Sequence, residues 1–132
     1  MTRVLVVHHD LDLGGQEADS LRRLGYEVVE CGGPTRNRCP VLAGHPCDLA
    51  ERADVLVCDV WASGDAEGAR RLIENIREIH PETPVVLTSP GLSLSWEQSE
   101  GRYRVTMLTG QPTGARLHEA IQDALATAPA TA

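Results

Sequence analysis

The 132-residue sequence contains no phenylalanine, and aromatic residues make up only 3% of it. It lacks any apolar run near the length of about 20 residues that a membrane-spanning helix needs. It also lacks an excess of basic residues, and its net charge of −7 argues against general affinity for nucleic acid. Neither a glycine-rich phosphate-binding loop nor a pair of nucleophile and base stands out. We therefore expect a protein that is not an enzyme and that has no membrane or nucleic-acid partner.

The first residues do not have the pattern of a signal peptide, because a strand is predicted to begin as early as Arg3. We expect a cytoplasmic protein on that basis. Hydrophobic residues make up 42% of the chain and charged residues 23%, which is typical of one globular domain with a real core. In a reducing compartment the four cysteines are more often thiols or metal ligands than disulfides.

Five short apolar segments alternate with helical patterns along the chain. The predicted strands are Arg3–Val7, Tyr26–Cys31, the run Ala53–Trp61, Val85–Ser89 and Tyr103–Leu108. The predicted helices cover 11–24, 48–52, 69–79 and 113–126, with a weak helix around Trp96. This alternation predicts a flavodoxin-like α/β fold, a doubly wound parallel sheet of five strands in the order 2-1-3-4-5. We assign 1–126 to one domain and 127–132 to a frayed tail.

Two stretches of the chain stand out, one in the predicted sheet and one in the first predicted helix. The central apolar run 53–61 contains Asp59 near its end, and open α/β sheets place their chemistry just past the carboxyl ends of strands. The pair Gly14–Gly15 lies early in the first helical pattern, where each glycine costs about 1 kcal/mol of helix propensity relative to alanine. We therefore expect the first helix to start late, near Gln16, after a flexible loop.

The order and spacing of these segments resemble the receiver domain of bacterial response regulators over nearly the whole chain. The residues that carry the resemblance are 4–7 followed by polar residues, 24–29, 54–59, 83–88 and Pro112. The resemblance implies that Asp59 occupies the position that accepts a phosphoryl group from a histidine kinase. It also implies that Thr88 occupies the position of the hydroxyl that binds the phosphoryl oxygens.

The remaining positions of the receiver pocket depart from the family pattern. His8 and His9 stand where the family has the acid pair that holds Mg²⁺, and Asp10 is an acid one place late. Gln111 stands where the family has a lysine. Imidazole suits Zn, Cu, Ni and Fe rather than Mg²⁺, and loss of the lysine removes positive charge that phosphoryl transfer needs. We therefore expect weak or absent phosphorylation, the behaviour of an atypical or pseudo-receiver.

The sequence also predicts how the histidine side chains are oriented. Because neighbouring residues on a strand point to opposite faces, His8 and His9 are not expected to bind one metal together. We expect one exposed ring and one ring hydrogen-bonded to the loop. His80 and His118 are expected on the surface.

A cysteine-rich loop covers 31–47 and contains Cys31, Cys39, His45 and Cys47. Three thiolates and one imidazole could fill a tetrahedral zinc site, and cysteines also hold iron–sulfur clusters. The spacing matches no established metal motif, so two alternatives stay open: a reversible disulfide of a redox sensor, or simply packed thiols. Cys58, inside the central strand, fits the packed alternative best.

The function that we expect is that of a stand-alone, atypical receiver-like module of two-component signalling, acting by protein–protein interaction. Its partner would be a histidine kinase or another signalling protein, and a homodimer is one arrangement that the resemblance allows. The alternative function is metal or redox sensing through Cys31, Cys39 and Cys47 on the same receiver-like scaffold, and the resemblance also connects the chain to the phosphorelay of two-component signalling.

Overall fold

The computed structural model describes residues 1–32, 40–41, 44–61, 70–89 and 105–127. Its centre is a five-stranded sheet in which every neighbouring pair is parallel, in the order β2-β1-β3-β4-β5. The strands are β1 (Arg3–Val7), β2 (Glu27–Cys31), β3 (Val55–Asp59), β4 (Val85–Ser89) and β5 (Val105–Thr109). The predicted fold class and strand order are confirmed.

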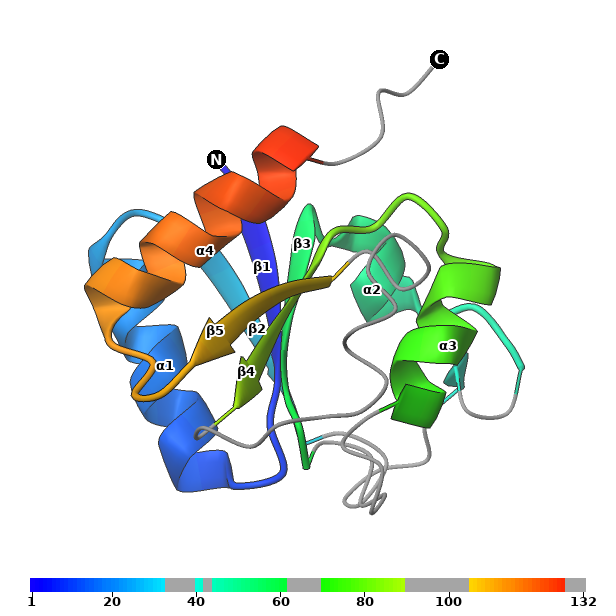
Figure 1. Ribbon diagram of the computed structural model, residues 1–132, viewed down its shortest axis with the longest axis horizontal. Coiled ribbons are helices and arrows are strands. Elements are labelled where there is room, and N and C mark those ends of the chain that lie inside the picture. Colours follow the sequence, from blue (N-terminus) through cyan, green and yellow to red (C-terminus); the bar gives the residue numbers. More distant parts are fainter. Residues whose placement is uncertain (33–39, 42–43, 62–69, 90–104, 128–132) are drawn as a thin grey trace.

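Helices cover both faces of this sheet (Figure 1). They are α1 (Leu11–Arg23), α2 (Asp48–Arg52), α3 (Arg70–Ile79) and α4 (Gly114–Thr127). Helices α1 and α4 pack on one face, and α2 and α3 lie on the other. Helices α1, α3 and α4 therefore lie where the 3.6-residue spacing of apolar side chains predicts them, and the short helix α2 has its predicted bounds.

Strands β3 and β4 lie inside the sheet and are buried along their whole length. This explains why each begins with three apolar residues and has few polar ones. Successive side chains alternate between the two cores. Val57 and Val86 pack toward α1 and α4, whereas Leu56 and Cys58 pack toward α3. The interpretation of Cys58 as a packed core residue is confirmed, since its side chain is fully buried.

The predicted late start of the first helix is wrong. Helix α1 begins at Leu11, because the Asp10 carboxylate accepts the backbone N–H groups of Asp12 and Leu13 and so caps the helix. The glycine at position 14, in the first turns of α1, is explained by packing. A Cβ on Gly14 would lie 2.8 Å from the Cβ of His8, so only glycine lets this turn approach the end of β1.

Some expectations lie outside the described residues. They are the weak helix around Trp96, the position of Cys39 and the tail from residue 128 onward. Helix α4 continues to Thr127, one residue beyond its predicted end. In the described part of the chain, no helix has the length and apolar character that crossing a membrane requires.

Candidate functional site

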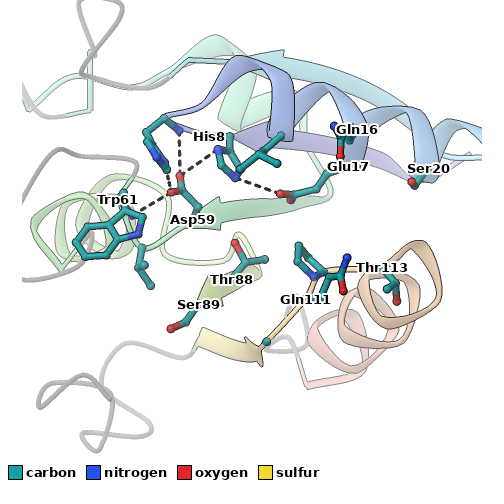
Figure 2. A pocket seen from close by; sticks show the side chains of 15 residues that line it. His8, Gln16, Glu17, Ser20, Asp59, Trp61, Thr88, Ser89, Gln111 and Thr113 are labelled. Carbon is teal, nitrogen blue, oxygen red and sulfur yellow. Dashed lines mark hydrogen bonds and ion pairs between the residues drawn. The ribbon is translucent and has the colours of Figure 1, made fainter. Parts of the chain in front are cut away.

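A hollow of about 400 Å³ opens at the carboxyl edge of the sheet, where chemistry is expected in folds of this kind (Figure 2). Its lining comes from the ends of the central strands, from one face of α1 and from the segment between β5 and α4. The lining side chains that matter most are His8, His9, Glu17, Asp59, Thr88 and Gln111. Residues far apart in the sequence therefore meet here around Asp59.

Asp59 is the last residue of β3 and is buried. Its Oδ1 accepts the backbone N–H of His9 at 3.1 Å. Its Oδ2 accepts the backbone N–H of Trp61 at 3.1 Å and lies 2.5 Å from Nδ1 of His9. Both oxygens are thus engaged by donors of the protein itself, and an ionised carboxylate forms strong hydrogen bonds with such donors.

His8 is buried at the end of β1 and is held from two sides. Its Nδ1 accepts the backbone N–H of Asp10 at 3.0 Å, and its Nε2 faces a carboxylate oxygen of Glu17 at 3.2 Å. Burial by itself lowers the pKa of His8, but the hydrogen bond to Glu17 and the negative charges of Asp59, Glu17 and Asp10 outweigh it. The net result is a pKa of His8 above its ordinary value.

Glu17 is a functional candidate that the sequence analysis missed. It lies on α1 and is only 5% exposed, and its Oε1 is buried without any hydrogen-bond partner among the described residues. A buried polar atom in this state is unfavourable unless something satisfies it. The sequence did hold one indication that Glu17 is buried. Glu17 lies on the apolar face of the helix, four residues before Leu21 and next to Ala18.

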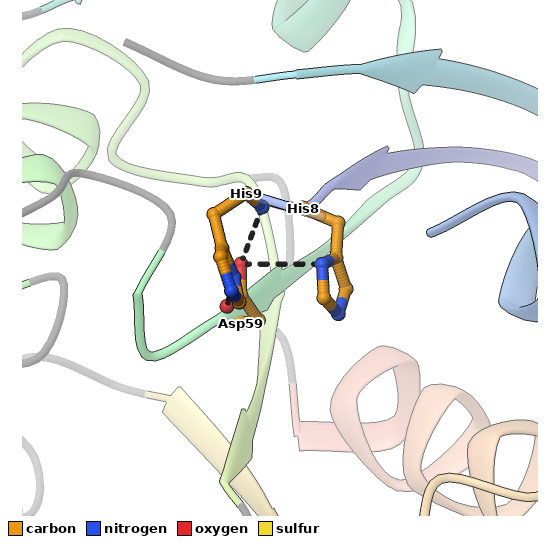
Figure 3. Close-up of side chains that lie close together, drawn as sticks. All are labelled: His8, His9 and Asp59. Atoms are coloured by element: carbon orange, nitrogen blue, oxygen red, sulfur yellow. Dashed lines mark hydrogen bonds and ion pairs between the residues drawn. The ribbon is translucent and has the colours of Figure 1, made fainter. Parts of the chain in front are cut away.

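The expectation that His8 and His9 point apart is wrong. Their rings are stacked, with centroids 5.0 Å apart and planes inclined by 20°, and both face Asp59 (Figure 3). The alternation rule applies to strand residues, whereas β1 ends at Val7 and the backbone then turns toward α1. One ligand atom from each of His8, His9 and Asp59 lies within 4.8 Å of the others.

The other predicted pocket residues divide into two groups. Thr88 and Gln111 line the hollow, and Thr88 pairs in register with Asp59 across β3 and β4. The Thr88 hydroxyl donates to the Cys58 carbonyl at 3.4 Å. Asp10 instead turns its carboxylate to the start of α1, and the hydrogen bond from the Leu13 N–H is the largest influence that lowers its pKa.

Positive charge is scarce around Asp59. All 12 basic residues of the chain are arginines, so no lysine exists anywhere in the sequence. None of the described residues that line the hollow is an arginine. Arg116, which follows the β5–α4 segment, donates to the carbonyls of Thr109 and Gln111 at 2.6 and 3.0 Å. Its guanidinium therefore holds the backbone of that segment.

The residues around Asp59 do not fit Mg²⁺, the cation that the sequence resemblance to receiver domains implies. Mg²⁺ demands near-octahedral coordination by oxygen atoms of carboxylates, carbonyls and water. Here two imidazoles occupy the positions nearest the Asp59 carboxylate, and Asp59 is the sole carboxylate in this group of described residues. The donor set is the one that borderline transition metals prefer.

The predicted cysteine site is not assembled by the described residues. Cys31 and Cys47 are half-buried against the core beside α2 and α3, and His45 is exposed. Among the described residues, these three do not gather within ligand distance of one another. Cys39 lies outside those residues, so the four-ligand site stays a prediction.

His80 is not on the surface as expected. It is 7% exposed, and its Nε2 accepts the backbone N–H of Cys47 at 3.1 Å. This bond connects the end of α3 to the start of α2. His118 is exposed as expected, although its Nδ1 lies 2.6 Å from the hydroxyl of Tyr26.

Comparison with known proteins points to one fold. No protein-family model matches the sequence, and no curated protein does. The chemotaxis protein CheY4 of Vibrio cholerae is similar in structure, with a TM-score of 0.71, 21% identity, and coverage of 95% of this chain and 99% of that one. A CheY-like receiver domain protein of Methanospirillum hungatei has a TM-score of 0.72, 15% identity and coverage of 96% and 94%.

The receiver domain of NtrX from Brucella abortus is similar as well, with a TM-score of 0.69, 25% identity, and coverage of 95% of this chain and 99% of that domain. Against the longer NtrX chain, the match covers 95% of this chain but only 27% of NtrX. The described architecture is therefore that of CheY-like receiver domains of response regulators.

Proposed function

We propose that the chain is a receiver-like signalling module that acts by protein–protein interaction, and that Asp59 accepts a phosphoryl group weakly or not at all. Its fold and the pairing of Asp59 with Thr88 support the receiver part of this proposal. The contacts of the Asp59 carboxylate support the second part, and they are the observation that carries the proposal.

A carboxylate can attack phosphorus only through an oxygen whose lone pair is accessible. Both oxygens of Asp59 already accept hydrogen bonds from within the protein, and the closest donor is the His9 ring. Such donors stabilise the resting carboxylate and lower its tendency to react. The His9 ring must leave before Oδ2 can act as a nucleophile.

The charge around Asp59 also disfavours an incoming phosphoryl group. Phosphoryl transfer depends mainly on positioning and on positive charge near the transferred oxygens. The pocket instead holds two buried carboxylates, Asp59 and Glu17, and its described lining has no lysine or arginine. An anionic phosphoryl donor is repelled unless another cation enters first.

Apolar side chains at the rim of the same pocket support binding of a protein partner. Leu13 and Trp61 both line the hollow and are 47% and 40% exposed. Aromatic side chains are enriched in protein interfaces, and tryptophan in particular is frequent among the residues that carry the binding energy. We propose that a signalling protein, either a histidine kinase or a downstream protein, contacts this rim without a need for phosphorylation.

The test is incubation with acetyl phosphate and Mg²⁺, followed by intact-mass analysis, with Asp59→Asn as the control. We expect no phosphoryl adduct that depends on Asp59, because the carboxylate is engaged and the lysine is missing. Stoichiometric phosphorylation that disappears in the Asp59→Asn variant would show a working phosphorelay receiver and would overturn the proposal.

The alternative function, metal or redox sensing through the cysteine-rich loop, stays a prediction. Cys31 and Cys47 lie on the same side of the sheet, which is the arrangement that the prediction needs. Its test is the thiol count and metal content of protein purified without chelator, compared with a Cys39→Ser variant. Inert thiols and a metal content unchanged by this substitution would remove the alternative.

A further inference from the structure

We propose that His8, His9 and Asp59 form a binding site for a divalent transition-metal cation, with Glu17 as the outer carboxylate that holds the His8 ring. Zn²⁺ represents the chemical class of the ligand. This inference goes beyond the proposed function and does not depend on a signalling role. It arises from the misfit between these residues and Mg²⁺.

The geometry of the three side chains suits such a cation. Bonds of about 2.0–2.1 Å to nitrogen or oxygen place tetrahedral ligand atoms about 3.3 Å apart. Nδ1 of His8 lies 3.9 Å from Oδ1 of Asp59, and Nδ1 of His9 lies 2.5 Å from Oδ2. These separations lie on either side of the required value. The His9 side chain is 39% exposed, so its ring has room to rotate away from the carboxylate.

The His8 ring is already held in the manner of a metal ligand. Metal-binding imidazoles usually donate their second N–H to a carboxylate, which orients the ring and increases the basicity of the ligating nitrogen. Nε2 of His8 faces Glu17 in this way, while Nδ1 is on the side of Asp59 and accepts the Asp10 N–H. Metal binding at Nδ1 replaces that single backbone hydrogen bond.

The charge of the cluster calls for a cation. With both imidazoles neutral, the buried carboxylates of Glu17 and Asp59 leave two negative charges in the site. Asp59 is stabilised by donors, but Oε1 of Glu17 has no hydrogen-bond partner among the described residues and is buried. Buried charge without compensation is strongly unfavourable. One divalent cation, or one proton on each of two imidazoles, neutralises the cluster.

The hollow beside the cluster leaves room for further ligands. Two imidazoles and one carboxylate provide three protein ligands, which is the pattern of zinc sites that keep one position open. The space of about 400 Å³ is in contact with all three. Water, or a side chain of a bound partner, can occupy the open position.

The test uses Co²⁺ as an optical probe of the zinc site, with affinity measured by titration. We expect Co²⁺ to bind with visible absorption of nitrogen and oxygen ligation, to be displaced by Zn²⁺, and to resist a large excess of Mg²⁺. His9→Gln and Asp59→Asn should each weaken binding by at least tenfold. Glu17→Gln should weaken it by about 10- to 100-fold, the usual effect of losing an outer partner of a ligand.

Matched variants separate this site from the cysteine-rich loop. His118→Gln alters an exposed imidazole on α4 and should leave Co²⁺ binding unchanged. Cys39→Ser should also leave it unchanged. Circular dichroism and thermal unfolding of each variant show that it folds, and Glu17→Asp should restore part of the affinity because it keeps the carboxylate.

Three outcomes would overturn the proposal: no Co²⁺ or Zn²⁺ binding by folded protein, binding with thiolate charge-transfer absorption that Cys39→Ser removes, or ring signals of His8 and His9 that respond to protons but not to metal. When the phosphorylation assay is run on metal-free protein with Mg²⁺ and acetyl phosphate, its result does not depend on transition-metal binding. Failure of either proposal is therefore recognised separately.

Discussion

Gly14 packs directly against His8, and a Cβ built on Gly14 would lie 2.8 Å from the His8 Cβ. This contact connects the local structure of α1 to the pocket, since His8 faces Asp59 on its other side. The neighbouring Gly15 makes no such contact, and a Cβ there would lie at an ordinary distance of 3.5 Å from the Glu30 side chain. The two glycines thus differ in role although they are adjacent.

The first prediction concerns this pair. Gly14→Ala should destabilise the protein, because overpacking typically costs about 1–3 kcal/mol and exceeds the gain in helix propensity. Gly15→Ala is the matched control and should stabilise it by up to about 1 kcal/mol, since it gains the same propensity without a clash. Urea unfolding measures both free energies. Equal effects of the two substitutions would show that Gly14 is not needed for the packing of His8.

The second prediction concerns pH. In metal-free protein the pKa of His8 is raised above the unfolded value of 6.5, so the folded state holds this proton more tightly. The resulting stabilisation is fully present below pH 6.5 and is lost as the pH rises through the folded-state pKa. The hydrogen bond to Glu17 is the largest influence that raises the pKa of His8. The Glu17→Gln substitution removes this carboxylate, so the pKa of His8 should fall.

An NMR titration of the His8 ring signals measures this shift, and urea unfolding below and above pH 6.5 measures the stability. The stability advantage of the natural protein over Glu17→Gln should shrink as the pH rises. Glu27→Gln is the control, because Glu27 pairs with Arg3 at the opposite end of the sheet. An unchanged pKa of His8 in Glu17→Gln would contradict the pairing seen in the structure.

The third prediction is a gain of phosphorylation in a variant that restores the receiver pattern. The variant combines His8→Asp, His9→Asp, Glu17→Gln and Gln111→Lys. The two new carboxylates supply oxygen ligands for Mg²⁺, the lysine supplies positive charge, and the neutral glutamine avoids repulsion between buried carboxylates. Acetyl phosphate with Mg²⁺ should then give a phosphoryl adduct in the mass spectrum.

The same combination with Asp59→Asn should give no adduct, and neither should the natural protein. If the restored variant is folded but stays unmodified, the four positions are not what limits the reactivity of Asp59. The physical account of the departures from the receiver pattern would then be insufficient.

The fourth prediction separates two histidines that the sequence treats alike. His80→Ala should lower the free energy of unfolding by about 1–3 kcal/mol, because it removes the acceptor of the Cys47 N–H from a buried position. His118→Ala should have a smaller effect, because His118 is exposed and the Tyr26 hydroxyl keeps its hydrogen bond from Gln122. Thermal or urea unfolding tests the order, and a larger effect at His118 would reverse it.

The sheet could be predicted because its information is local. Val85–Ser89 begins with three apolar residues and is flanked by turn-forming residues, and its observed limits equal the predicted ones. Helix α3 follows from the spacing of Leu72, Ile73 and Ile76 on one face. Asp59 could be selected because a carboxylate that ends a central strand lies at the carboxyl edge of the sheet in any register of this fold.

By itself, then, the sequence determined the α/β class, the strand order and the position of Asp59 at the carboxyl edge of the sheet, because each depends on periodicity and on the order of segments. Only the tertiary structure decided that both histidine rings face Asp59 and that Glu17 completes the group. The orientation of a side chain just after a strand depends on how the backbone turns. Here that turn depends on the Asp10 cap of α1 and on the close contact of Gly14 with His8. Both contacts need these particular residues, but their effect on the histidine rings is set by how α1 packs against the end of β1, which the apolar periodicity does not give.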